Sequence, residues 1–162
     1  MYENSVTATI GLSERERQVA LALLILRISL GVFLLLWGLE KIIIPARTVG
    51  IYDKFYGIPI DTAIAPMLGA LQIALAAALL IGFKRRWSYG LATLLHTYSV
   101  VSSWRSLIDP WGLIYGEVKH LFLAGVPVLA GFIVLYMLRE MDLWTVDGRR
   151  GRDGQSEEPT NT

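Results

Sequence analysis

Four long apolar segments limit what this chain of 162 residues can fold into. They cover residues 19–44, 63–83, 87–107 and 121–138. Each reaches or approaches the roughly 20 residues that an α-helix needs to cross a hydrocarbon core about 30 Å thick. Helices of a water-soluble core would carry a polar face at helical spacing, and the second and fourth segments lack one. The sequence therefore predicts an all-α integral membrane protein.

We expect the first segment to stay in the mature protein. Its apolar run is too long for a cleavable signal peptide, and no small-residue cleavage site follows it. Short connections between consecutive spans favour an up-down-up-down four-helix bundle. The bundle is expected over residues 19–144, between a cytoplasmic segment (1–18) and a disordered polar tail (145–162).

The distribution of Lys and Arg predicts the orientation, because cytoplasmic loops are enriched in both residues. With the N-terminus inside, nine of them lie on the cytoplasmic side and five on the outer side, with a KRR cluster (84–86) in a very short inner loop. We therefore expect both termini in the cytoplasm. Tryptophan prefers the membrane interface, and the tryptophans fall near the span ends or in the loop before the fourth span: Trp37, Trp87, Trp104, Trp111 and Trp144.

Three polar side chains stand at similar depths in the predicted spans. At 1.5 Å per residue, Arg27 and His96 lie about 12 Å from the inner ends of their spans, and Gln72 lies about 17 Å from its own. A charge at this depth costs at least about 2.5–3.5 kcal/mol, and no carboxylate lies in the inner half of any span to neutralise Arg27. Gly31 and Gly38 share the face of Arg27 and let another helix approach it. The three polar residues therefore form a candidate pocket for an electron-rich oxygen, such as a quinone carbonyl.

A polar stripe runs along the third span. Its members recur every three or four residues: Thr93, His96, Ser99, Ser103, Ser106 and Asp109. Such a face must turn toward the bundle, a partner or a bound ligand, so we add Ser99 and Ser103 to the candidate pocket. Structural roles stay open beside this one. Arg27 can reach the headgroups, the stripe can join helices, and His96 can be a satisfied interior histidine.

A second polar group lies at the predicted outer rim: Glu40, Lys41, Arg105, Asp109, Lys119 and His120. Mixed charges near water favour a solvated ion-pair belt, with a binding site as the alternative. The two histidines differ in depth by about 15 Å or more, which argues against a bis-histidine haem. The chain has no cysteine, which excludes thiolate catalysis and iron–sulfur clusters, and we predict no metal site. A net charge of +1 also argues against nucleic-acid binding.

Two segments of the sequence resemble the DoxX family of membrane proteins. They are LRISLGVFLLLWGLEKI in the first span and LGALQIALAAALLIGFKRRWSYGLATLLH across the second and third. The resemblance extends over residues 19–138. It implies a four-helix membrane bundle, a bacterial inner-membrane location and an association with membrane oxidoreductase complexes, such as thiosulfate:quinone oxidoreductase. Related four-helix proteins that catalyse thiol–disulfide chemistry need cysteines, which this chain lacks.

Three functions stay open at this stage, and the sequence does not decide whether the chain is an enzyme. The first is a small subunit of a quinone-linked or other membrane redox complex, in which Arg27 would donate hydrogen bonds to a quinone, Gln72 would orient it and His96 would relay a proton. The second is a non-catalytic assembly or anchoring protein for a partner complex. The third is a small-solute transporter, which four short helices without repeats favour least. The expected partners are the lipid bilayer and an oxidoreductase, and the pattern also allows a homo-oligomer.

Overall fold

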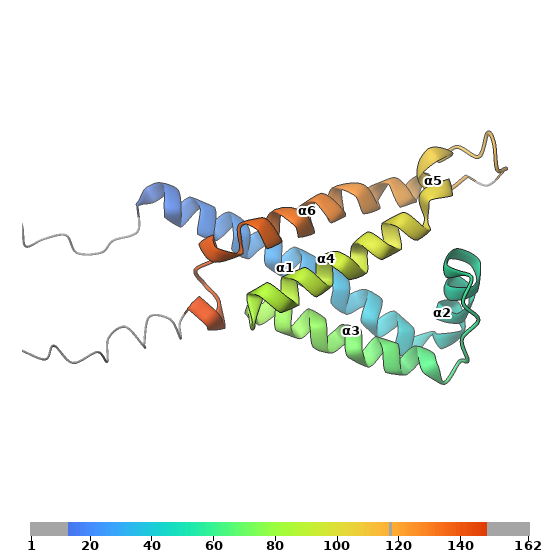
Figure 1. Cartoon of the computed structure of the whole chain (residues 1–162), viewed down its shortest axis with the longest axis horizontal. Coiled ribbons are helices and arrows are strands. Elements are labelled where there is room, and N and C mark those ends of the chain that lie inside the picture. Colours follow the sequence, from blue (N-terminus) through green and yellow to red (C-terminus); the bar gives the residue numbers. More distant parts are fainter. Residues whose placement is uncertain (1–12, 117, 149–162) are drawn as a thin grey trace, which may run out of the picture.

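The computed structural model describes residues 13–116 and 118–148, and its regular elements in these ranges are helices (Figure 1). The longest are α1 (Glu14–Ile43), α3 (Ile64–Ile81), α4 (Arg85–Ser102) and α6 (Gly125–Met137). The 3-10 helix η2 (His120–Ala124) runs directly into α6. Consecutive long helices run in opposite directions (Figure 1).

Three of these helices are long and apolar enough to cross a membrane. They are α1, α3 and the continuous η2–α6 segment His120–Met137. The helix α4 has the same number of residues as α3 but is more polar, because it begins with two arginines and carries the stripe of hydroxyl groups. Three helices therefore support several membrane crossings, and a crossing by α4 stays a prediction.

Both ends of the first helix pair follow from local sequence. Ser13 and Glu16 form a capping box at the start of α1, in which the Ser13 hydroxyl accepts the Glu16 N–H at 3.3 Å and the Glu16 carboxylate accepts the Ser13 N–H at 2.8 Å. The helix thus begins five residues before the predicted span, and residues 1–12 lie outside the described residues. At the end of α3, Gly82 adopts φ +67°, the left-handed cap that favours glycine.

The helices pack in two pairs, α1 against α3 and α4 against α6. A Cβ on Gly69 would lie 2.7 Å from the carbonyl oxygen of Gly38, and a Cβ on Gly31 would lie 2.5 Å from the side chain of Leu80. The expected close approach along the glycine face of α1 is therefore confirmed. The buried core between the pairs is apolar: Leu23, Leu30, Leu34, Ala76, Leu79, Tyr89, Ala92, Phe132 and Leu135.

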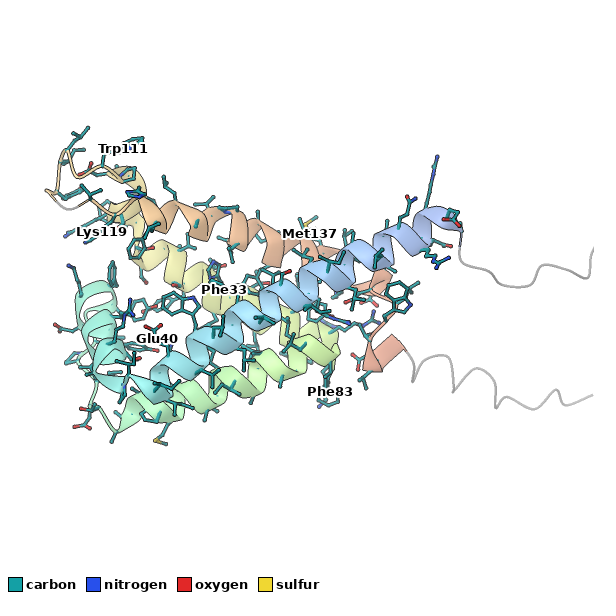
Figure 2. All side chains as sticks on the ribbon, turned by 180° about the vertical axis from the view of Figure 1, so that it is seen from behind. Phe33, Glu40, Phe83, Trp111, Lys119 and Met137 are labelled. Atoms are coloured by element: carbon teal, nitrogen blue, oxygen red, sulfur yellow. The ribbon has the colours of Figure 1, made fainter. Side chains whose placement is uncertain are left out.

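The two pairs meet at the α3–α4 turn and diverge toward the opposite end (Figure 1). We call the end with this turn the inner end and the opposite one the outer end. Figure 2 shows Phe83 at the inner end and Trp111 and Lys119 at the outer end. The described ends of the chain, near residues 13 and 148, both lie toward the inner end (Figure 1).

The connection between the first two predicted spans is itself helical. It forms α2 (Pro45–Ile51) and the π-helix η1 (Tyr52–Tyr56), which lie between the diverging ends of the two pairs (Figure 1). The rings of Tyr56 and Tyr98 lie 4.9 Å apart, and those of Phe55 and Phe122 lie 5.4 Å apart. This connection therefore bridges α4 and η2 at the outer end.

The third predicted span is interrupted near its outer end. The helix α4 ends at Ser102, and a separate short helix, α5 (Trp104–Ile108), follows. The hydroxyl group of Ser103 lies 3.0 Å from the carbonyl oxygens of Ser99 and Val100. The helix expected over 87–107 is therefore interrupted at Ser103.

The chain folds back after α6 through the 3-10 helix η3 (Arg139–Met141). Thr145 is only 2% exposed, and the Asp147 carboxylate accepts the backbone N–H groups of Lys84 and Arg85 at 3.1 and 2.9 Å. The predicted tail from residue 145 is therefore wrong for its first residues, because they pack against the α3–α4 turn. Residues 149–162 lie outside the described part.

Candidate functional site

Arg27 is engaged in a buried network at the inner end. Its Nη1 donates to Oδ2 of Asp142 at 3.0 Å, and its Nη2 donates to the carbonyl oxygen of Trp144 at 2.7 Å. The Tyr89 hydroxyl donates to the same carboxylate oxygen at 2.7 Å. Side-chain exposure is 3% for Arg27 and 0% for Asp142. We call Arg27, Tyr89, Asp142 and Trp144 the inner-end network.

This network corrects the expectation of an unneutralised cation. Asp142 follows the fourth predicted span, and it reaches Arg27 only because the chain folds back under the bundle. A Cβ at Gly82 would lie 2.8 Å from Nη1 of Arg27 and 2.5 Å from Thr145, so a glycine at this turn leaves room for the returning segment. The network joins α1, α4 and the segment after α6. Nη1 and Nη2 of Arg27 each donate within it, whereas the buried Nε has no hydrogen-bond partner among the described residues.

Gln72 and His96 also bond to the protein itself. Nε2 of Gln72 donates to the carbonyl oxygen of Leu34 at 3.0 Å. Nε2 of His96 lies 3.1 Å from the carbonyl oxygen of Gly125, and its ring meets Phe33 edge-on at 5.4 Å. Both side chains therefore lie at one level of α1, about two turns from Arg27.

The structure does not bring the candidate interior residues into one pocket. Arg27 turns to the inner end, whereas Gln72 and His96 satisfy backbone carbonyls further along the bundle. Ser103 lies at the break between α4 and α5, and Ser99 is exposed. Of this set, Ser103 lines a cavity at the outer end, which is described below, and ligand binding by the interior residues stays a prediction.

The predicted outer-rim group divides into two parts. Glu40 pairs with Arg47 at 2.9 Å, and Nζ of Lys41 donates to the carbonyl oxygen of Trp37 at 3.3 Å. His120 is exposed at the start of η2. The remaining members border a cavity: Arg105, Asp109 and Lys119.

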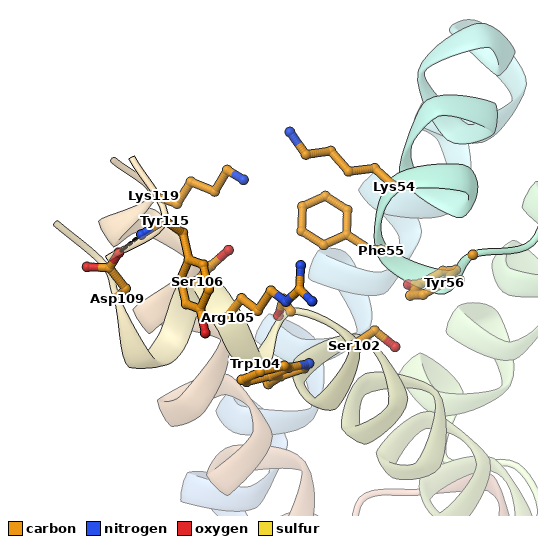
Figure 3. Close-up of a pocket in the computed structure, with 12 residues that line it drawn as sticks. Lys54, Phe55, Tyr56, Ser102, Trp104, Arg105, Ser106, Asp109, Tyr115 and Lys119 are labelled. Carbon is orange, nitrogen blue, oxygen red and sulfur yellow. Dashed lines mark hydrogen bonds between the residues drawn. The ribbon is translucent and has the colours of Figure 1, made fainter. Parts of the chain in front are cut away.

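This cavity, which we call the outer pocket, has a volume of about 570 Å³ (Figure 3). It lies between η1 and the α4–α5 junction at the outer end. Three cationic side chains line it: Lys54, Arg105 and Lys119. Four aromatic rings complete its walls: Phe55, Tyr56, Trp104 and Tyr115.

Arg105 is the residue of the outer pocket best placed to bind a ligand. Its guanidinium carbon lies 5.5 Å from the centre of the Trp104 ring and 5.6 Å from that of Tyr115. Stacking on two rings orients a guanidinium without using its N–H groups. Among the described residues, no carboxylate pairs with Arg105 and no group accepts a hydrogen bond from it.

Asp109 lines the same pocket but serves the backbone of the following loop. Its carboxylate accepts the N–H groups of Leu113, Ile114 and Tyr115, each at 2.7 Å. Burial alone would raise the pKa of Asp109, but these hydrogen bonds outweigh it and lower the pKa below its ordinary value. In Figure 3 the carboxylate is turned away from the cavity. Asp109 therefore fixes the loop that carries Tyr115.

Sequence reasoning missed Lys54 and the aromatic walls of the pocket. The signal was present, because Tyr52, Phe55 and Tyr56 stand close together in the first connection. Nothing in the sequence, however, shows that η1 reaches the α4–α5 junction. Burial raises the pKa of the Tyr56 phenol, which keeps its hydroxyl protonated near Ser99.

The DoxX family model matches residues 22–104, which is half of the chain. The chain belongs to the DoxX family. No curated protein and no solved structure matches it significantly. The matched part of this DoxX-family protein includes Lys54, Phe55 and Tyr56 and ends just before Arg105.

Family membership agrees with the helices of the structure. The DoxX match begins in α1 and ends at the first residue of α5, so it covers the first three long helices but not α6. With three helices apolar and long enough to cross a membrane, this DoxX-family protein is a multi-pass membrane protein.

Proposed function

We propose that this DoxX-family protein crosses the bacterial inner membrane four times as an up-down four-helix bundle, with both termini in the cytoplasm. Two observations support the fourth span. At 1.5 Å per residue the 18 residues of α4 rise about 27 Å, close to the thickness of a hydrocarbon core. The helix α4 also runs beside α6 along its length (Figure 1). The two described chain termini and the basic residues 84–86 all lie at the inner end, which supports a cytoplasmic location of both termini.

Within the membrane, we assign the protein the role of a small subunit of a redox complex that holds an electron-rich amphiphile in the outer pocket. The observation that carries this role is the Arg105 guanidinium, which lies over the rings of Trp104 and Tyr115 and has no hydrogen-bond acceptor among the described residues. Arg27 does not serve this purpose, since it does not line the outer pocket and its charge is paired with Asp142.

Quinone is the amphiphile that a redox role suggests. A quinone ring can pack against the aromatic walls of the outer pocket, while its carbonyl oxygen accepts a hydrogen bond from Arg105. The outer pocket has room for such a headgroup, with a volume of about 570 Å³. The quinone site that we propose therefore lies at the outer end, and not at the interior residues where the sequence led us to expect it.

The test is the affinity of the purified protein for a short-chain quinone analogue in detergent, measured by titration calorimetry. We expect Arg105→Ala to weaken binding at least tenfold. Arg47→Ala is the matched control, because Arg47 is an outer-end arginine that does not line the outer pocket and should leave the affinity unchanged. Equal affinity of the wild type and Arg105→Ala would exclude quinone binding at this site.

A second candidate function is the assembly or anchoring of a partner complex. The loop after Asp109 presents apolar side chains to its surroundings, with exposures of 66% for Trp111, 85% for Leu113 and 71% for Ile114. The Asp109 carboxylate holds the backbone of this loop in place. If this role is correct, a partner recovered in mild detergent at fixed stoichiometry should be lost from a Leu113→Asp/Ile114→Asp variant but retained by Arg105→Ala.

A further inference from the structure

The outer pocket lies where the headgroups of the outer leaflet would be. The helix α4 rises about 27 Å from the basic residues 84–86 at the inner end, which places its last residue, Ser102, near the opposite membrane interface. Ser102 and the Trp104 ring both line the pocket. Tryptophan favours the membrane–water interface. A ligand in the outer pocket is therefore level with the polar ends of lipids.

The lining of the outer pocket favours an anionic ligand over a neutral one. Lys54 comes from η1, Arg105 from α5, and Lys119 from the residue before η2, so three elements direct cations to one cavity (Figure 3). Asp109 is the carboxylate among the described lining residues, and its oxygens already accept backbone N–H groups. A guanidinium matches the oxygens of a phosphate group with two parallel hydrogen bonds.

An apolar surface continues from the outer pocket along α4. The Tyr56 ring of the pocket contacts Tyr98, and Tyr98, Val101 and Leu94 are exposed on the outside of α4. In a bilayer, exposed apolar side chains of a spanning helix face the lipid chains. A ligand with a polar head in the pocket can therefore extend its apolar chains along this surface.

We infer that the outer pocket binds the phosphate headgroup of an anionic amphiphile of the outer leaflet, with Arg105 as the main phosphate ligand. This inference rests on the proposed function only in taking the outer pocket as the ligand site. Lys54 and Lys119 add positive charge at its rim, and the aromatic walls pack against the part of the amphiphile next to the phosphate.

The experiment uses the purified full chain in a neutral detergent and compares four probes by titration calorimetry. They are dioctanoyl phosphatidylglycerol, dioctanoyl phosphatidylcholine, inorganic phosphate and the short-chain quinone analogue. We expect phosphatidylglycerol to bind at least tenfold more tightly than phosphatidylcholine or inorganic phosphate. Arg105→Ala should lose this preference, Arg105→Lys should retain part of it, and Arg47→Ala should retain all of it. Circular dichroism of each variant checks that the helices are intact.

The four probes separate failure of this inference from failure of the proposed function. If inorganic phosphate binds as tightly as phosphatidylglycerol, the outer pocket is a site for a free oxyanion, and the inference that its ligand is an amphiphile is wrong. Quinone binding that depends on Arg105, without a preference for phosphatidylglycerol, would overturn the inference and leave the proposed function standing. If no probe distinguishes the wild type from Arg105→Ala, both proposals are wrong.

Discussion

Arg27 and Asp142 place opposite charges side by side in a setting almost without water. Their side chains meet at 3.0 Å, and Tyr89 and Trp144 supply further hydrogen bonds. An ion pair of this kind need not add much to stability compared with an apolar pair of the same volume. The loss of one partner is a different matter, because the remaining charge stays buried without compensation.

We therefore predict that Asp142→Ala lowers the free energy of unfolding by about 3–5 kcal/mol, the usual cost of breaking a buried pair. The double variant Arg27→Met/Asp142→Leu should recover most of this loss, since it removes both charges and keeps the volume. Thermal unfolding in detergent, followed by circular dichroism, measures both. The control is Arg47→Ala, which removes the exposed partner of the half-buried Glu40 and should cost less than Asp142→Ala. A loss for Asp142→Ala no larger than that of the control would show that the network does not hold the inner end together.

Asp109 has the corresponding role for a loop at the outer end. Its pKa is lowered in the folded protein, so its ionised form contributes stability at any pH above the ordinary carboxyl pKa of about 3.9. This contribution is lost as the pH falls through the lower pKa of the folded state. The loop should therefore keep its structure from neutral pH down to about pH 4.

Asp109→Ala should remove this support at every pH. We expect the amide protons of Leu113, Ile114 and Tyr115 to exchange at least tenfold faster at pH 7 in this variant, because their common acceptor is gone. Hydrogen–deuterium exchange with mass spectrometry measures the effect, and amides within α3 serve as the internal reference. Unchanged exchange in the loop would mean that the carboxylate does not order it.

Among the helices, the α1–α3 contact leaves the least room for change. Gly38 and Gly69 bring the two backbones together, and the position of a Cβ on Gly69 is 2.7 Å from a backbone oxygen that cannot rotate away. We expect Gly69→Ala to cost about 1–3 kcal/mol of unfolding free energy through overpacking. Gly50→Ala on α2 is the matched control, since a Cβ there meets nothing within 4 Å and alanine favours the helix. If the two variants melted alike, the close approach would not be a tight contact.

The elements also show how far sequence reasoning reaches. The first two spans, predicted over 19–44 and 63–83, correspond to α1 and α3, because a long apolar run admits few alternatives to a helix. Hydrophobicity does not predict where α2 and η1 lie in the fold, because their position depends on ring contacts with distant helices. The outer pocket could be predicted only in part, since Arg105 and Lys119 carry charge near a span end but Lys54 reaches them only through the fold.

The inner-end network could not be predicted for the same reason. Arg27 was correctly singled out as a residue that needs an account in the middle of a span. Its partner lies 115 residues away in a polar stretch, and depth along a helix says nothing about a segment that turns back. Arg27 and His96 were placed at nearly the same depth, whereas the structure sets Gln72 and His96 at one level about two turns from Arg27. Gln72 and His96 each meet a backbone carbonyl that no sequence pattern marks.

At the scale of the whole molecule, the proposed orientation can be tested because the chain has no cysteine of its own. Single cysteines at Ile58 and Arg86, both exposed, mark the outer and inner ends. We expect a membrane-impermeant maleimide to label Ile58→Cys in intact cells and to label Arg86→Cys only after the membrane is permeabilised. The opposite pattern would reverse the topology and move the outer pocket to the cytoplasmic side.

The long separation of Arg27 and Asp142 has a consequence for how the protein is made. Asp142 is synthesised 115 residues after Arg27, so a first helix that enters the lipid during translation carries its cation without this partner. Only a chain translated beyond α6 can cancel that cation. The ion pair between Arg27 and Asp142 can therefore form only after the last helix has been synthesised. A nascent chain arrested earlier would keep α1 poorly anchored.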